Sequence, residues 1–478
     1  MRGVIPTTAD KVRPDPGDAI MSAPALKTRM FKAAGWLIGS NLTGQLLRLT
    51  SNLILTRLLL PEAFGLVAAV NTLYFGLVMF SDLGVWQSVI RSEHGKDRRF
   101  LGTAWSVQLL RGLLLFLIVM LFALILYVGA GAGWFESGTV YADPRLPPMM
   151  MVFGLTALIQ GFESMNLAAA QRELLGSQLA RLEILSQFAA MVVTVTLAWL
   201  TRSVWSLLIG SVVSSVVRTL MSHFALPGKM IRPAWDSAFA WEIVGFGKWI
   251  FLSSIIGFLA ANGEKLILGG SLSVASFGIF SIASLLMAAF VGVYSSLNGH
   301  VIFSSLSLAL KSGDQAEQVR VFAHVQSLAD LFLGVSAGVI IMSGQWAVWI
   351  LYDQRYHAAG WMLQCLGLSV IAIRHQVTEQ LMFARGKPSW VSANNALRAI
   401  ALVVLIPVGQ RVSGEFGAIL AVALCQFASW PLSLAFKREQ GLLTWATERW
   451  WLPALAVGLG LGWLVNATLT WIFPLLHR

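Results

Sequence analysis

Charged residues are scarce in this sequence. They make up 12% of its 478 residues, whereas hydrophobic residues make up 56%, and soluble domains average about 25% charged residues. Apolar runs recur along the chain, each close to the ~20 residues that a helix needs to cross a bilayer, without the alternating polarity of a transmembrane β-barrel. Because backbone polar groups in lipid must be satisfied internally, we predict an all-α polytopic membrane protein.

Cysteines and catalytic motifs are also few. The two cysteines, Cys365 and Cys425, lie in apolar segments without a second ligand at metal-binding spacing, which excludes a disulfide framework and a zinc site. None of the Gly-Lys pairs has the Ser or Thr and the upstream Gly of a phosphate-binding loop. No connection is long enough for an extramembrane catalytic domain. We therefore expect no cofactor, no metal and no enzyme activity.

Thirteen segments are candidate membrane spans, and we expect between twelve and fourteen in total. They cover residues 31–55, 64–90, 103–128, 148–168, 184–201, 204–224, 243–264, 273–297, 319–343, 358–383, 391–410, 415–436 and 451–474. The first 30 residues hold no apolar core followed by a cleavage site, so we predict a disordered tail.

The basic balance of the chain predicts its orientation. The net charge is +11, and most Lys and Arg residues outside the spans fall in the tail and in connections 91–100, 169–183, 225–242, 298–320, 384–390 and 437–450. These connections alternate along the chain, as the positive-inside rule requires of cytoplasmic loops. We predict a bacterial inner (plasma) membrane protein with a cytoplasmic N-terminus, and we do not read the charge as a sign of nucleic-acid binding.

The sequence contains an internal repeat at an offset of 213 residues. Trp36 aligns with Trp249, residues 53–55 align with 266–268, and Phe64-Gly65 aligns with Phe277-Gly278; ten of thirty positions agree. The offset spans six helices, so both halves share one orientation, which is typical of transporters with a substrate site between parallel repeats. We predict six-helix bundles over 31–224 and 243–436, joined by a cytoplasmic linker over 225–242 and followed by an extra membrane segment within 437–478.

The first span carries a polar face. Asn41, Gln45, Arg48 and Asn52 recur at spacings of three and four residues, which places them on one side of a helix. Arg48 lies mid-span, where a charge is costly and commonly faces a cavity. Its guanidinium could bind a diphosphate or an acidic sugar bidentately; the alternative is an ion pair with a carboxylate on a neighbouring helix.

The tenth span holds the densest polar cluster, with Arg374, His375 and Glu379 close in sequence. Arg374 and His375 are candidates for binding an anionic head group, and Glu379 beside His375 could exchange protons. The alternative is a structural polar seam between helices.

Four further acids are candidates for ion coupling: Glu163, Asp330, Asp82 and Glu264. Glu163 comes first, because polar residues flank it at helical spacing. Asp82 could instead cap the loop after its helix, and Glu264 with Lys265 could be solvated at a periplasmic turn.

Two stretches carry a resemblance to a known family. SNLILTRLLLPEAFGLVAAV (51–70) with FSDLGVWQSVIR (80–91), and FGKWIFLSSIIGFLAANGEKLILGG (246–270) with FGIFSIASLL (277–286), resemble the openings of the two halves of the polysaccharide transporter family. That family belongs to the superfamily of multidrug/toxin extruders and the lipid II flippase. Where the family usually has Asp before the LILG run, this sequence has Glu264.

The resemblance implies a Wzx-type flippase that carries undecaprenyl-diphosphate-linked oligosaccharide repeat units from the cytoplasmic to the periplasmic leaflet. It also implies two bundles around a central cavity, alternating access, and work alongside a polysaccharide polymerase and export machinery. A cation-coupled multidrug exporter of the same superfamily is the first alternative. Such an exporter would bind cationic drugs through acidic residues, whereas the charged residues in the middle of the spans here are more often Arg. A membrane enzyme that joins sugars is the second, and it would need a long periplasmic loop that is missing here.

Overall fold

The computed structural model describes residues 23–82, 84–95, 97–228 and 230–476, and within them the chain is helical with only an isolated β-bridge between Thr139 and Ser273. The predicted tail lies mostly outside these residues, and α1 already begins at Ala23. The helices are α1 (Ala23–Leu58), α2 (Pro61–Phe80), α3 (Val85–Arg91), α4 (Arg98–Gly131), α5 (Leu146–Gly161), α6 (Asn166–Arg172), α7 (Gly176–Thr201), α8 (Trp205–Phe224), α9 (Ser237–Gly269), α10 (Val274–Leu297), α11 (Phe303–Lys311), α12 (Gln315–Leu351), α13 (Ala359–Ala372), α14 (His375–Ala384), α15 (Pro388–Cys425), α16 (Trp430–Glu439), α17 (Trp445–Arg449) and α18 (Trp451–Leu476); short 3₁₀ turns cover Val140–Ala142, Gln354–Tyr356 and Gln426–Ser429, and a π-helical turn covers Asn298–Ile302.

The chain is a multi-pass membrane protein. In the described part, eight helical segments are long and apolar enough to cross a bilayer, so the total of thirteen spans stays a prediction.

One of the eight, Pro388–Glu439, covers two predicted spans. Its backbone leaves the helical conformation at Ser413 and Gly414, and Gly409 and Gly417 then lie in backbone contact. A tight turn therefore folds the two arms of α15 against each other, which only residues without a Cβ allow at that distance.

Three predicted spans are each divided into two helices. The segment predicted over 64–90 ends as α2 at Phe80 and resumes as α3 after Gly84, whose φ of 62° is left-handed. The segments predicted over 148–168 and 358–383 likewise break after α5 and after α13. At the break after α5, the Ser222 hydroxyl of α8 accepts a hydrogen bond from the Ser164 backbone N–H at 2.9 Å. Tertiary hydrogen bonds thus satisfy a backbone that the helix leaves unpaired.

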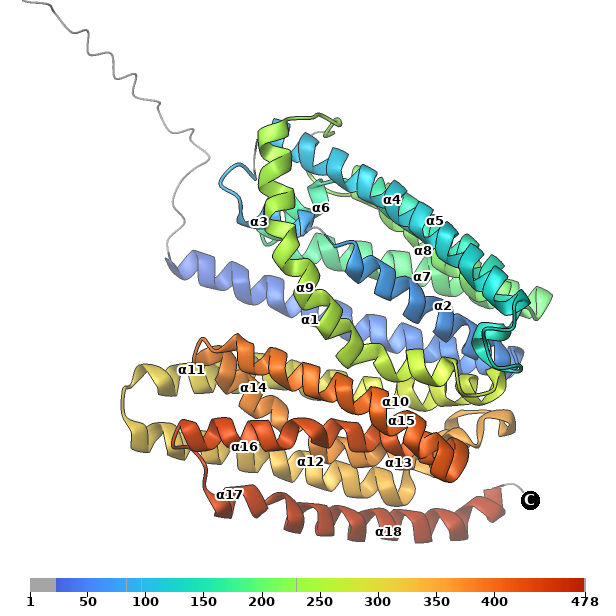
Figure 1. The fold of residues 1–478 in the computed structure, drawn as a ribbon. Helices are drawn as coiled ribbons and strands as arrows, with labels where there is room; N and C mark the ends of the chain where they lie inside the picture. Colours follow the sequence, from blue (N-terminus) through green and yellow to red (C-terminus); the bar gives the residue numbers. More distant parts are fainter. Residues whose placement is uncertain (1–22, 83, 96, 229, 477–478) are drawn as a thin grey trace, which may run out of the picture.

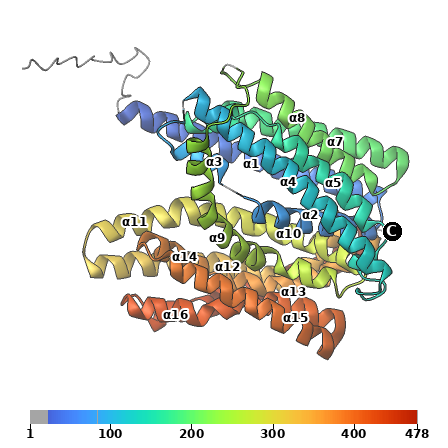
Figure 2. The same cartoon turned by 45° about the horizontal axis from the view of Figure 1, so that its top comes forward.

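The helices form two groups (Figures 1 and 2). One group contains α1 to α8 and the other α10 to α18, and the long α9 runs from the first group to the second. In the second group α18 lies along α12, where Gly334 and Gly338 meet Gly458 and Gly462 with no space for side chains. The Gly458 and Gly462 pair therefore serves close helix packing within the chain, as is common for small residues in membranes.

The two groups meet in a backbone contact between α2 and α10. A Cβ on Gly65 would lie 2.3 Å from the Val274 carbonyl oxygen, and a Cβ on Gly278 would lie 1.9 Å from the Pro61 carbonyl oxygen. Gly65 and Gly278 are partners in the sequence repeat. Equivalent residues of two repeats touch each other only close to the axis that relates them, so the predicted repeat would place its pseudo-two-fold axis at this contact. The two six-helix repeats themselves stay a prediction.

Gly278→Ala is expected to destabilise the protein by about 2 kcal/mol or more, because the new methyl group overlaps backbone that cannot move aside cheaply. Thermal unfolding of the purified protein in detergent would measure this as a lower midpoint. Gly292→Ala is the matched control, since a Cβ there meets nothing within 4 Å on the same helix. Equal midpoints for the two variants would contradict the close contact.

Candidate functional site

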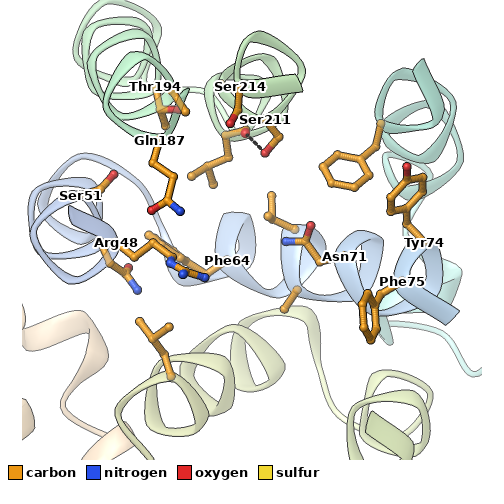
Figure 3. A pocket seen from close by; sticks show the side chains of 18 of the residues that line it. Arg48, Ser51, Phe64, Asn71, Tyr74, Phe75, Gln187, Thr194, Ser211 and Ser214 are labelled. Carbon is orange, nitrogen blue, oxygen red and sulfur yellow. Dashed lines mark hydrogen bonds between the residues drawn. The ribbon is translucent and has the colours of Figure 1, made fainter. Parts of the chain in front are cut away.

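A cavity of about 950 Å³ lies between the two groups of helices. The first group lines it with α1, α2, α5, α7 and α8, the second group contributes α10, and the connecting helix α9 completes the lining. Figure 3 shows Arg48 and Ser51 of α1 on one side, Ser211 and Ser214 of α8 on another, and Asn71 of α2 on a third. The cavity lining combines polar and charged side chains with apolar ones.

Helical periodicity explains why polar side chains gather there. Ser211, Ser214, Ser215 and Arg218 of α8 recur every three or four residues and all line the cavity. Positions at this spacing share one side of a helix, and the opposite side is then free to face lipid or other helices. The same rule brings Arg48 of α1 into the cavity together with its neighbours Ser51 and Asn52.

Two cations in the cavity lack an acidic partner among the described residues. The Arg48 side chain is exposed to the cavity and donates only a long bond, 3.4 Å, to the Gly44 carbonyl oxygen of its own helix. Lys265 of α9 is half-buried in the cavity wall, and no described carboxylate lies within ion-pair distance of it. A charge in a partly enclosed, low-dielectric site attracts a counter-charge strongly. The arrangement therefore suits an anionic ligand.

The third cation of the cavity is neutralised. The Arg218 guanidinium donates to the Glu163 carboxylate at 2.9 Å and to the Glu183 carboxylate at 2.5 Å. Glu183 also accepts the Gln187 amide at 2.6 Å, and Gln187 rests against Gly44, where a Cβ would lie 2.7 Å from its amide oxygen. A continuous hydrogen-bonded wall thus joins α5, α7 and α8.

The four polar residues predicted on the first span divide into two pairs. Arg48 and Asn52 line the cavity, and the Asn52 Oδ1 is buried without a hydrogen-bond partner. Asn41 and Gln45 are exposed and are not part of the lining. They lie nearer the start of α1, beyond the part of the helix that borders the cavity.

Arg374 lies away from the cavity in a buried ion network. Its guanidinium binds both carboxylate oxygens of Asp330, at 2.8 and 2.7 Å, and one oxygen of Glu448 at 2.7 Å. Lys437 binds the other Glu448 oxygen at 2.6 Å, and the Trp430 ring lies 5.5 Å from the Arg374 guanidinium carbon. Arg374 is only 2% exposed. This is the structural polar seam that the sequence left open as the alternative.

His375 and Glu379 form a second cluster with Arg398 of α15. Arg398 lies 3.0 Å from the His375 Nε2 and 3.3 Å from a Glu379 oxygen, and it also donates to Asn395. None of these residues lines the cavity. His375 is buried and lies against the Ala372 carbonyl oxygen, so both of its ring nitrogens already have partners.

The remaining acids predicted for ion coupling have different surroundings. Glu163 borders the cavity, whereas Asp330 is fully buried beside Arg374. Asp82 accepts the Gly84 backbone N–H at 3.0 Å and lies 3.9 Å from Arg111, which fits the capping role considered for it. Glu264 is half-buried on α9 outside the cavity lining, although the adjacent Lys265 lies within it.

Sequence reasoning missed Arg218, Glu183, Gln187 and Asn71, and it placed Lys265 at a solvated turn. Arg218 could have been found, because it ends the serine-rich stripe of α8 and is a charge within an apolar span. Lys265 gave no such signal. It enters the cavity because the end of α9 crosses beside α2.

Hydrogen bonds tie the connections of the two groups to the ends of α1 and α9. The Tyr141 hydroxyl of the first group donates to the Leu266 carbonyl oxygen of α9 at 2.7 Å, and the Tyr356 hydroxyl of the second group donates to the Leu59 carbonyl oxygen at 2.9 Å. Arg355 donates hydrogen bonds to two carbonyl oxygens in the last turn of α1 and to the Asp353 carboxylate. The hydrogen bonds from Arg355 to Asp353 hold the pKa of Asp353 below its usual range. Tyr141 therefore docks on the end of α9, and Arg355 and Tyr356 dock on the end of α1.

The fold and the cavity define a membrane transporter. The chain belongs to the polysaccharide biosynthesis protein family, whose model matches residues 54–360, and this confirms the resemblance noted in the sequence. It is 22% identical over 461 residues to the lipopolysaccharide biosynthesis protein WzxC of Escherichia coli (strain K12), covering 93% of this chain and 90% of that protein.

Two solved structures share the fold. The lipid II flippase MurJ in an inward closed conformation matches with a TM-score of 0.64 at 10% identity, covering 92% of this chain and 99% of that one. A multidrug resistance MATE family transporter of the MOP superfamily, in its inward-facing conformation, matches with a TM-score of 0.63 at 12% identity, covering 85% and 96%.

Arg374→Ala is expected to lower the amount of folded protein in the membrane, because it leaves Asp330 and Glu448 buried with fewer charged partners. Breaking a buried ion pair in this way costs about 3 to 5 kcal/mol. Quantitative immunoblotting of membranes and size-exclusion profiles in detergent would measure the loss. Arg438→Ala, at an exposed arginine of α16, is the control. Wild-type levels of the Arg374 variant would argue against the structural role.

Proposed function

We propose that this protein is a flippase that moves undecaprenyl-diphosphate-linked oligosaccharide repeat units from the cytoplasmic to the periplasmic leaflet, for exopolysaccharide, capsule or O-antigen biosynthesis. The observation that carries the proposal is the pair of cations without a described carboxylate within ion-pair distance, Arg48 and Lys265, in the cavity between the two groups of helices. Membership of the polysaccharide biosynthesis family supports it.

The size and lining of the cavity suit the head group of such a lipid. Its volume of about 950 Å³ lies at the upper end of the ~300 to 1,000 Å³ typical of ligand pockets. A diphosphate and a few sugars fit within that range, whereas the polyprenyl tail stays in the bilayer. Arg48 and Lys265 bind the diphosphate, and neutral polar side chains bind sugar hydroxyls.

The protein works by alternating access in the inner membrane. With the N-terminus in the cytoplasm, the end closed by Tyr141 and Tyr356 faces the periplasm and the cavity receives its substrate from the cytoplasmic side. The two parallel bundles, residues 31–224 and 243–436, pivot about the contact of Gly65 with Gly278. Glu163, paired with Arg218, is the candidate for coupling to an ion gradient, and the membrane potential adds ~2.3 kcal/mol per charge per 100 mV.

A multidrug exporter is the second candidate, because a multidrug transporter shares the fold. Cationic drugs would need free carboxylates in the cavity, however, and both carboxylates near Arg218 are already paired with it. A deletion strain separates the two functions. Lipid-linked repeat units that accumulate on the cytoplasmic side, and recover with the intact gene, support the flippase; normal surface polysaccharide with new drug sensitivity supports the exporter.

Arg48→Ala and Lys265→Ala are each expected to weaken the binding of undecaprenyl diphosphate about tenfold, since a hydrogen bond to a charged group is worth ~1.5 to 3 kcal/mol. Native mass spectrometry of the purified protein with this lipid would measure the affinity. Arg57→Ala removes a cation from the same helix outside the cavity lining and serves as the control. If all three variants bind like the wild type, the diphosphate site lies elsewhere.

Tyr141→Phe combined with Tyr356→Phe is expected to open the periplasmic end more often, because the double change removes two reciprocal hydrogen bonds and little volume. Spin labels at positions 136 and 354, in the exposed loops of the two groups, would show a larger share of long distances. Tyr127→Phe, at an exposed position of α4, is the control. An unchanged distance distribution would show that these bonds do not hold the closed state.

A further inference from the structure

The connection between α8 and α9, together with the first turns of α9, carries large apolar side chains that stay exposed. Met230 and Trp235 of the connection are 78% and 63% exposed, and Trp241 of α9 is 75% exposed. Apolar side chains gathered in this way on a surface indicate contact with a partner or with a membrane. Residues 230–241, which contain all three, are called the strap below.

The strap is held on α4 through its backbone. The Ala234 N–H donates to the Gly102 carbonyl oxygen at 3.2 Å, and the Ser106 hydroxyl donates to the Ala234 carbonyl oxygen at 2.8 Å. A Cβ on Gly102 would lie 2.8 Å from the Arg232 carbonyl oxygen. Ile231 is buried in a hydrophobic cluster with residues of α3, α4 and α6. The strap therefore has a fixed place along α4 (Figure 1).

The first turns of α9 bury one side and expose the other. Ala240 and Ile243 are buried in the same hydrophobic cluster, whereas Trp241 is exposed. Glu242 accepts the Ser92 hydroxyl at 2.9 Å, which ties these turns to the end of α3. The first group of helices thus leaves the indole ring of Trp241 uncovered.

The strap lies at the level of lipid head groups. α4 is one of the candidate membrane spans, and its exposed leucines begin at Leu110. Ser106, which contacts the strap, precedes Leu110 by four residues, and four residues rise ~6 Å along a helix. The head-group region on each side of the hydrocarbon core is ~5 to 8 Å thick. The strap therefore lies about one head-group layer outside the apolar surface of α4.

The side chains there suit that layer. Tryptophan is enriched at membrane interfaces, because its ring is apolar and its N–H is polar. Arg232 of the strap is exposed, as are Arg98 and Arg99 in the first turn of α4, and guanidinium groups bind phosphate oxygens bidentately. The neighbouring acids Asp97 and Asp236 accept backbone N–H groups at the starts of α4 and α9, where the helix dipole offsets their charge.

We propose that the strap is a membrane-interface anchor whose partner is the phospholipid layer beside it. Met230, Trp235 and Trp241 insert between the head groups. Arg232 binds lipid phosphates, together with the two arginines at the start of α4. The strap joins the two groups of helices, so this contact fixes the start of α9 to the membrane surface. The anchor goes beyond the proposed function, because it does not depend on what the cavity carries.

Spin labels can measure the depth of the strap in the full-length protein, reconstituted in vesicles of phosphatidylethanolamine and phosphatidylglycerol. Cys365→Ala and Cys425→Ala remove the native thiols, and Trp235→Cys and Trp241→Cys then each carry a nitroxide. Both labels should collide with oxygen severalfold more often, relative to a water-soluble nickel chelate, than a label at Ser312→Cys. Ser312 is exposed between α11 and α12 and is the control for water. Labels at 235 and 241 that match it would overturn the anchor.

A fluorescence measurement keeps the indole rings that labelling removes. The emission of Trp235 and Trp241 is the difference between the wild type and the double variant Trp235→Phe with Trp241→Phe. In the same vesicles, lipids brominated close to the head groups should quench this difference, whereas aqueous iodide should leave it nearly unchanged. Trp463→Phe, at an exposed position in the middle of α18, gives the matched difference for a ring in the hydrocarbon core. Quenching of the strap by iodide instead of by brominated lipid would place both rings in water and overturn the inference.

Discussion

The contact between Gly65 of α2 and Gly278 of α10 determines how the two groups of helices are placed. Because neither residue has a Cβ, the two backbones lie closer than any other pair of residues would permit. The contact holds the groups together at one end, and the cavity forms where they separate from it. Tyr141 and Tyr356 reinforce the same end. This junction therefore sets how closely the two groups approach each other.

Two arginines within apolar segments show how burial decides the role of a charge. Arg374 is enclosed by helices that supply Asp330 and Glu448, so its charge is balanced and contributes to a unique packing. Arg48 faces a cavity and has only a carbonyl of its own helix as partner. A buried cation without a counter-charge would be too costly to retain, whereas a cavity allows a ligand to supply that charge.

The cavity is also asymmetric, although the sequence contains a repeat. Its lining comes mostly from α1, α2, α5, α7 and α8, and in the second group the polar residues Arg374 and Glu379 are occupied by internal ion pairs. The charged residues of the two groups therefore have different surroundings: Arg48 faces the cavity, whereas Arg374 is buried among carboxylates. In the described cavity, Glu163 is paired with Arg218, whereas Arg48 and Lys265 have no carboxylate within ion-pair distance.

The sequence by itself determined that the chain folds in a membrane, that it is all-helical and which family it belongs to, and it located the polar side of α1. These results follow from the sequence because hydrophobicity, the scarcity of charge and helical periodicity are local properties. It also singled out Arg48, which lines the cavity, and it predicts a repeat that contains Gly65. Only the tertiary structure decided which charges are paired, since Asp330 and Arg374 are 44 residues apart and Arg218 and Glu163 are 55 residues apart. Lys265 enters the cavity, and Arg374 does not, because the packing of distant helices fixes where each side chain points.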